Sequence, residues 1–186
     1  MRSIKKFTFT HRVLHWLMAL SMTILFITGF LRMYWMNKNN IVTIMKEKTT
    51  NVSDDVMKNI ATTIREPMWE WHEIFAYVMI SAFVIRLCYM IVKGIRFPNP
   101  FSKNLLLKQR LQGLTYVYFY AFVLIASITG VFIQYHLFST YKDEIEAVHK
   151  WGLYCFPIFI LLHLMGIVLA EHSYQKGITS KMIGGD

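Results

Sequence analysis

Four histidines lie near the ends of long apolar segments, and two of them follow a regular spacing. His149 and His163 are 14 residues apart. In an α-helix this spacing corresponds to roughly 21 Å along the axis, and it returns both side chains to within about 40° of the same face. One helix face would therefore present two imidazoles at two depths. Histidine is costly inside a membrane-spanning helix and indicates a functional site there.

Each of these two depths has a second histidine on another segment. His15 lies near the start of the first apolar segment, level with His163, and His72 starts the second, level with His149. Imidazoles from two helices can ligate a haem iron from both sides in the core of a bundle. Isolated polar histidines would not account for the matched depths. The pattern therefore predicts two b-type haems, one for each cross-helix pair.

Glycines on the first and third apolar segments are candidates for haem packing. Gly29 follows His15 by 14 residues and should lie at the depth of the other pair, and Gly130 is a second candidate. A glycine leaves room for a macrocycle against the backbone. Both positions could instead allow close packing between helices.

Two arginines are candidates for binding haem propionates. Arg86 follows His72 by 14 residues inside an apolar segment, and Arg12 precedes His15 by one turn. A buried guanidinium needs an anionic partner, which a propionate would supply. The alternative for Arg86 is that its side chain extends toward the lipid headgroups.

The elements that position these residues are four apolar segments, each long enough to cross a bilayer. The chain has 186 residues, of which 55% are hydrophobic. We predict helices over about residues 13–35, 68–93, 111–136 and 147–172. A polar outer loop over 37–66 should contain one short surface helix after Ser53. The predicted fold class is all-α: a single-domain transmembrane four-helix bundle with cofactors in its core.

Charge sets the predicted orientation. The net charge is +9. One side of the predicted bundle collects 11 Lys and Arg against two acidic residues, whereas the other has eight against nine. The positive-inside rule places the basic side, with both termini, in the cytoplasm. We expect a multi-pass protein of the bacterial cytoplasmic membrane that contacts lipid. The basic charge then needs no nucleic-acid partner. His15 and His163 become the inner pair, and His72 and His149 the outer pair.

Several stretches together resemble a known family. They are Phe7-Thr-Phe-Thr-His-Arg-Val-Leu-His-Trp16, Ile27-Thr-Gly-Phe30, the His72 helix ending in Arg86-Leu87, Ile128-Thr-Gly-Val131, the His149 and His163 pair, and Lys176-Gly-Ile-Thr-Ser-Lys-Met-Ile-Gly184. The chain resembles the di-haem cytochrome b subunits of membrane-bound formate dehydrogenase and nickel–iron hydrogenase, within the wider bacterial cytochrome b-561-like group. The resemblance covers nearly all of the chain except the outer loop.

The resemblance implies the same ligand pairs and also implies partners. An iron–sulfur subunit of a catalytic dehydrogenase or hydrogenase would pass electrons to the outer haem, and menaquinone or ubiquinone would react near the inner one. The corresponding quinone pocket lies beside the inner ligand of the fourth helix and a glycine that aligns with Gly113, with Gln112 nearby. The flanking positions are Leu111 and Leu114, where the family has Asn and Gln.

Two other functions remain open from the sequence. One is a stand-alone di-haem oxidoreductase linked to quinone, such as a superoxide oxidase, which neighbouring genes or co-purification would distinguish. The other is a haem-free transporter or anchor that uses histidines for protons or a metal, with Glu70 or Glu73 adding a carboxylate near His72. Cys88 and Cys155 form neither C-x-x-C nor C-x-x-C-H. This argues against a thiolate metal site and covalently attached haem.

Overall fold

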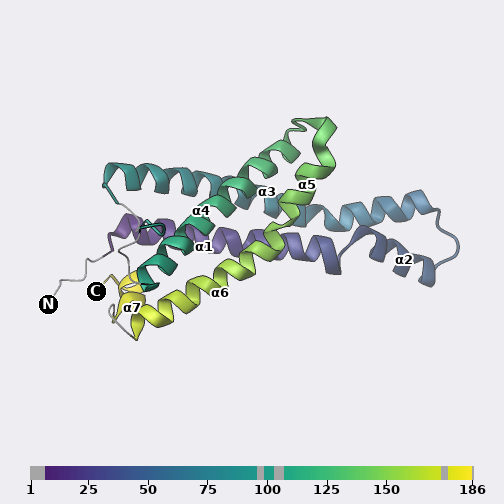
Figure 1. Ribbon diagram of the computed structural model, residues 1–186. Coiled ribbons are helices and arrows are strands. Elements are labelled where there is room, and N and C mark those ends of the chain that lie inside the picture. The colour runs from purple at the N-terminus through teal and green to yellow at the C-terminus, as the bar shows by residue number, and fades with distance from the viewer. Residues whose placement is uncertain (1–6, 96–98, 103–106, 173–175, 186) are drawn as a thin grey trace.

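The computed structural model describes residues 7–95, 99–102, 107–172 and 176–185, and every regular element within these ranges is a helix (Figure 1). Four helical stretches are long and apolar enough to cross a membrane: Phe9–Trp35, Asp54–Val92, Leu107–Gln134 and Ser139–Glu171. The predicted all-α class with four spans is confirmed. Some of the Lys and Arg residues that were counted to predict the orientation lie outside the described residues: Arg2, Lys5, Lys6, Arg96 and Lys103.

The spans consist of seven helical elements. They are α1 (Phe9–Phe30) with the π-helical turn η1 (Leu31–Trp35), α3 (Asp54–Val92), α4 (Leu107–Gln134), the 3-10 turn η2 (Ser139–Tyr141), α5 (Lys142–Lys150) and α6 (Gly152–Glu171). Most of their side chains face outward. In the most apolar part of each span, the share of residues that are buried runs from 11% in α4 to 28% in α1. Such extensive apolar exposure suits lipid rather than water, and the chain is an integral membrane protein.

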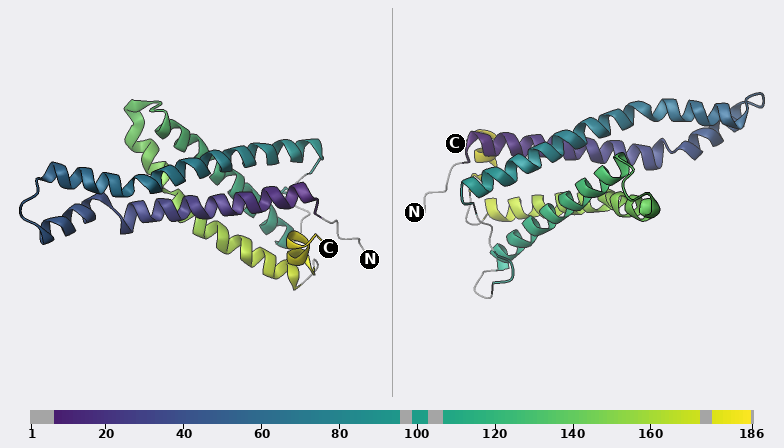
Figure 2. Two further views of the ribbon diagram at one scale, coloured as in Figure 1. Left: turned by 180° about the vertical axis from the view of Figure 1, so that it is seen from behind. Right: turned by 90° about the horizontal axis from the view of Figure 1, so that it is seen from above.

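The bundle has two layers. Figure 2 shows α1 and α3 side by side in one layer, with α4 and α6 in the other. The buried apolar core between them consists of Leu14, Met18, Met22, Met79, Ala82, Phe83, Val123, Phe156 and Phe159. On α3 this core falls between His72 and Arg86, and its two α6 members fall between His149 and His163 in the sequence. The packed core therefore separates two ends of the bundle.

The outer segment 37–66 differs from the predicted loop. It contains α2 (Lys38–Lys48), which is capped by Asn37: the Asn37 side chain accepts a hydrogen bond from the Asn39 amide at 2.9 Å. The expected surface helix after Ser53 is the first part of α3, which continues for 39 residues across Pro67 into the membrane span. Proline lacks an amide hydrogen and commonly ends a helix, but here the helix is continuous. Figures 1 and 2 show this hairpin of α2 and α3 extending beyond the rest of the bundle.

The predicted fourth helix, 147–172, is also interrupted. The helix α5 ends at Lys150 and α6 begins at Gly152, with Trp151 between them. The Trp151 amide bonds to the Val148 carbonyl at 3.1 Å, three residues back rather than four. Glycine has a low helix propensity, and Pro157 in the first turns of α6 removes a further backbone bond. His149 and His163 therefore lie on two successive helices rather than one.

The C-terminal helix α7 (Ile178–Ile183) folds back against the start of α1. Arg12 Nη1 donates to the Ile183 carbonyl at 3.1 Å, and the indole N–H of Trp16 donates to the Met182 carbonyl at 3.3 Å. The Glu171 carboxylate accepts a bond from the Gly177 amide at 2.6 Å and so holds the turn before α7. The tail thus covers the end of the bundle that carries His15.

Candidate functional site

The predicted outer pair comes together between α3 and α5. The rings of His72 and His149 have centroids 6.3 Å apart, and their planes are 72° apart. Each ring also contacts a hydroxyl from a different helix. His72 Nδ1 is 2.8 Å from Thr28 Oγ1 of α1, and His149 Nδ1 is 3.0 Å from Thr129 Oγ1 of α4.

A neutral imidazole that keeps its Nε2 lone pair for a ligand carries its hydrogen on Nδ1. In that tautomer His72 donates to Thr28 Oγ1 and His149 donates to Thr129 Oγ1. Each threonine can then donate its own hydrogen to a carbonyl of its helix, Ile24 at 2.8 Å for Thr28 and Ile125 at 2.7 Å for Thr129.

Each threonine is followed by a glycine that lies against the same pair. A Cβ atom on Gly130 would be only 3.1 Å from His149 Cε1. A Cβ atom on Gly29 would be 4.0 Å from His72 Cε1 and 3.6 Å from Leu153 Cδ2, which is ordinary contact. The predicted glycines therefore both lie at the outer pair, and Gly130 is the more tightly constrained.

The predicted inner pair comes together between α1 and α6. The rings of His15 and His163 have centroids 6.0 Å apart, with an angle of 43° between their planes. Phe159 stacks on the His163 ring at 5.4 Å. Trp16 lies edge-on to the His15 ring at 5.5 Å. Among the described residues, no side chain hydrogen-bonds a ring nitrogen of either inner histidine.

Both pairs fit an iron ligated from two sides. A metal–imidazole nitrogen bond is about 2 Å long and the ring centroid lies about 1.1 Å further on, so two such rings have centroids roughly 6.2 Å apart. The observed 6.0 Å and 6.3 Å agree with this value. The described residues contain no group of three or more His, Cys, Asp or Glu that could hold a bare metal ion. Two facing imidazoles suit a metal whose other ligands come from a macrocycle.

The glutamates considered for a metal near His72 are engaged elsewhere or exposed. Glu73 accepts bonds from Gln134 Nε2 at 2.8 Å and from the Tyr77 hydroxyl at 3.3 Å, which connects α3 to α4. Glu70 is exposed. The geometry therefore gives no support to a carboxylate ligand beside His72.

Both arginines predicted as propionate candidates lie in the half of the bundle that carries His15 and His163. Arg86 is 9% exposed, and its Nε donates to the Tyr120 hydroxyl at 3.1 Å. Arg12 has a buried Nε without a hydrogen-bond partner in the described part of the chain. An anionic group would satisfy this buried donor.

Two arginines that sequence reasoning missed lie toward the outer pair. The Arg32 guanidinium lies 4.7 Å from the centre of the Trp69 ring, and Trp69 stacks on His72 at 5.9 Å. Arg65 donates to the Arg32 carbonyl at 3.2 Å, and its Nε is buried without a partner among the described residues. Arg65 is seven residues, or two helical turns, before His72, a signal that becomes visible once α3 is known to be continuous.

Thr28 and Thr129 were also missed as site residues. Their signal in the sequence is the repeated Ile-Thr-Gly at 27–29 and 128–130. The predicted quinone residues lie near the start of α4, where Gly113 is buried and Gln112 is half-buried. Their role stays a prediction.

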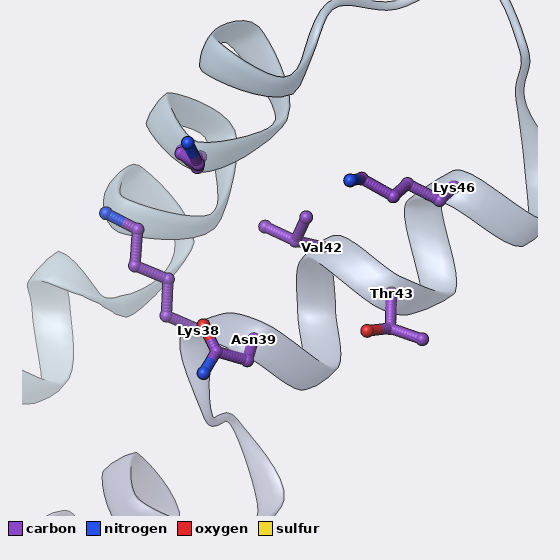
Figure 3. Close-up of a pocket in the computed structure, with 6 residues that line it drawn as sticks. Lys38, Asn39, Val42, Thr43 and Lys46 are labelled. Atoms are coloured by element: carbon purple, nitrogen blue, oxygen red, sulfur yellow. The ribbon is translucent and has the colours of Figure 1, made fainter.

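A separate open pocket of about 410 Å³ lies on the outer hairpin, between α2 and α3. Figure 3 shows its lining, which comes from Lys38, Asn39, Val42, Thr43, Lys46 and Lys58. The Lys46 ammonium is 2.8 Å from Asp54 Oδ2, and Lys58 is 3.7 Å from Asp55 Oδ1. Two of the three lysines therefore have acidic partners, and none of the four paired histidines is among the residues that line the pocket.

One family model matches almost the whole chain. It is described as prokaryotic cytochrome b561 and covers residues 6–185. No curated protein and no solved structure matches the chain significantly.

Proposed function

Because the chain belongs to the prokaryotic cytochrome b561 family, and such membrane cytochromes transfer electrons through b-type haem, we propose that this chain binds two haems and connects an outer electron donor to a membrane quinone. The observation that carries the proposal is the presence of two cross-helix imidazole pairs. Each pair has the centroid separation that a shared iron requires. The packed core lies between them.

In this proposal each histidine has one role. His15 and His163 hold the inner haem, and His72 and His149 hold the outer haem. Bound haem supplies reversible one-electron chemistry at iron, and the protein sets its position and surroundings. The aromatic and sulfur-containing side chains of the core exclude water between the two sites and keep the region of low polarity.

The charged residues at each end support propionate binding. Arg12 and Arg86 are proposed for the inner haem, since both are arginines of the inner half and one has a buried unpaired Nε. Arg32 and Arg65 are proposed for the outer haem because they lie with Trp69 beside His72. Bidentate guanidinium binding is well suited to a carboxylate in a site of low polarity.

The partners follow from the two ends of the molecule. We propose that the hairpin of α2 and α3 docks the iron–sulfur subunit of a dehydrogenase or hydrogenase, because it extends beyond the rest of the bundle. The quinone is proposed to bind near His163, with Gly113 and Gln112 at the start of α4. In the proposed orientation both termini lie in the cytoplasm of a bacterium, and the chain spans the cytoplasmic membrane.

Single histidine variants test the two-haem proposal. His149→Ala should remove the outer haem and leave the inner one, and His163→Ala should do the reverse, as measured by pyridine haemochrome per mole of protein. His136→Asn is the matched control, since His136 lies at the outer end in a left-handed backbone conformation (φ 53°) that asparagine tolerates. Full haem content in both pair variants would overturn the proposal.

A further inference from the structure

The two histidine pairs differ in what their ring nitrogens contact. In both outer histidines Nδ1 lies within hydrogen-bond distance of a threonine hydroxyl, His72 of Thr28 and His149 of Thr129, and in the tautomer that leaves Nε2 for iron each ring donates Nδ1–H to that hydroxyl. The described residues provide no such acceptor for His15 or His163. General packing does not account for the asymmetry, because both acceptors are threonines and each immediately precedes a glycine that lies against the same ring.

An acceptor on Nδ1–H changes the histidine as a ligand. It fixes the tautomer that leaves Nε2 free, it fixes the ring orientation, and it makes the imidazole a stronger electron donor to iron. Stronger donation favours the oxidised over the reduced metal. The reduction potential of a haem held by such rings is therefore lower than that of a haem held by rings without the acceptor.

On the basis of the proposed function, we propose that Thr28 and Thr129 are positioning residues that give the outer haem a lower reduction potential than the inner haem. The two threonines act through the histidines and do not touch the iron. A lower outer potential favours electron movement from the outer site to the inner site. This is the direction required for a donor on the hairpin side and a quinone on the other.

The threonines are well placed for this role. Thr28 is buried, and each hydroxyl is itself anchored by donating to a carbonyl of its own helix. The acceptor oxygen is therefore held still relative to the ring. Thr28 of α1 bonds to His72 of α3, and Thr129 of α4 bonds to His149 of α5. Each hydrogen bond therefore also connects two helices.

The test is a redox titration of the purified cytochrome with Thr28→Val and Thr129→Val. Valine keeps the shape of threonine but removes the hydroxyl. Removing the hydrogen-bond partner of a metal-ligating side chain commonly weakens metal binding by at least about tenfold. If this tenfold loss affects only the oxidised haem, the reduction potential of the outer haem rises by about 59 mV for a one-electron couple. The inner potential should not move. His149→Ala identifies which of the two potentials is the outer one.

Serine variants and distant threonines provide the controls. Thr28→Ser and Thr129→Ser keep the hydroxyl and should restore the wild-type potential. Thr23→Val on α1 and Thr115→Val on α4 remove exposed hydroxyls that bond only to their own helix, and should leave both potentials unchanged. If a valine variant loses the outer haem, retention of that haem in the serine variant supports the positioning role, and loss in both variants overturns it.

The result also separates this inference from the proposed function. Unchanged potentials in both valine variants with two haems bound would overturn the threonine inference alone. An outer potential higher than the inner one in the wild-type protein would overturn it as well. A wild-type protein that does not bind two haems would overturn the proposed function itself.

Discussion

Gly130 is the position at which a single added carbon should most directly disturb the outer site. A Cβ atom there would be 3.1 Å from His149 Cε1, where ordinary contact begins at 3.4 Å. The His149 ring must therefore move by at least about 0.3 Å for Gly130→Ala. If the ring moves directly away from Thr129, the bond between Nδ1 and Oγ1 lengthens from 3.0 Å to about 3.3 Å, beyond the usual range for N–H···O bonds.

The expected loss can be estimated from this movement. Losing the hydrogen-bond partner of a metal-ligating side chain commonly lowers the affinity for the metal 10- to 100-fold. We therefore expect Gly130→Ala to bind the outer haem at least about tenfold more weakly. Gly130→Val adds two further methyl groups beside the ring and should abolish outer haem binding. Alanine favours a helix over glycine by roughly 1 kcal/mol, so an unfolded α4 would not explain the loss.

Haem titration of the apoprotein in detergent, with pyridine haemochrome of the purified product, measures this effect. Gly166→Ala on α6 is the matched control, because a Cβ atom there would have no heavy atom within 4 Å. It should bind two haems normally. Full outer haem content in Gly130→Val would refute the reasoning, as would an equal loss in Gly166→Ala.

Three further predictions follow from the same geometry. Arg86→Gln removes a buried positive charge in the inner half and should lower the inner reduction potential in a redox titration, whereas Arg86→Lys should retain most of it; equal shifts in both variants would contradict this. Trp69→Leu removes the ring between Arg32 and His72 and should reduce outer haem content, whereas Trp71→Leu, which alters an exposed ring, should not. Lys46→Ala breaks an exposed ion pair with Asp54 and should leave the unfolding midpoint unchanged in a thermal or denaturant assay; a clear fall in that midpoint would show that the pair supports the hairpin.

The four spans could be predicted from the sequence because long runs without charge have few other structures available. The histidine pairs could be anticipated for a related reason: once helices cross the membrane, depth follows from position along the chain. This logic placed His15 opposite His163 and His72 opposite His149, and the structure brings those rings within about 6 Å. Their roles as iron ligands stay a prediction.

The remaining features depend on contacts between helices. The second helix was predicted over about residues 68–93, yet α3 already begins at Asp54 and is continuous across Pro67, with Met57 and Ala61 buried on the preceding turns. The break at Trp151 lies where a charged segment meets the fourth apolar segment, and the helix predicted over 147–172 ran across this point. Thr28 is 44 residues from His72, so no local pattern could reveal their hydrogen bond.

The central claim is that each of two irons is bound from both sides by imidazoles from different helices. The most direct measurement is the haem-to-protein ratio of the purified chain by pyridine haemochrome, combined with the spin state of the oxidised protein from its absorption and electron paramagnetic resonance spectra. The predicted result is two b-type haems per chain, both six-coordinate and low-spin. A ratio of one, or a five-coordinate high-spin signal from either haem, would contradict the account.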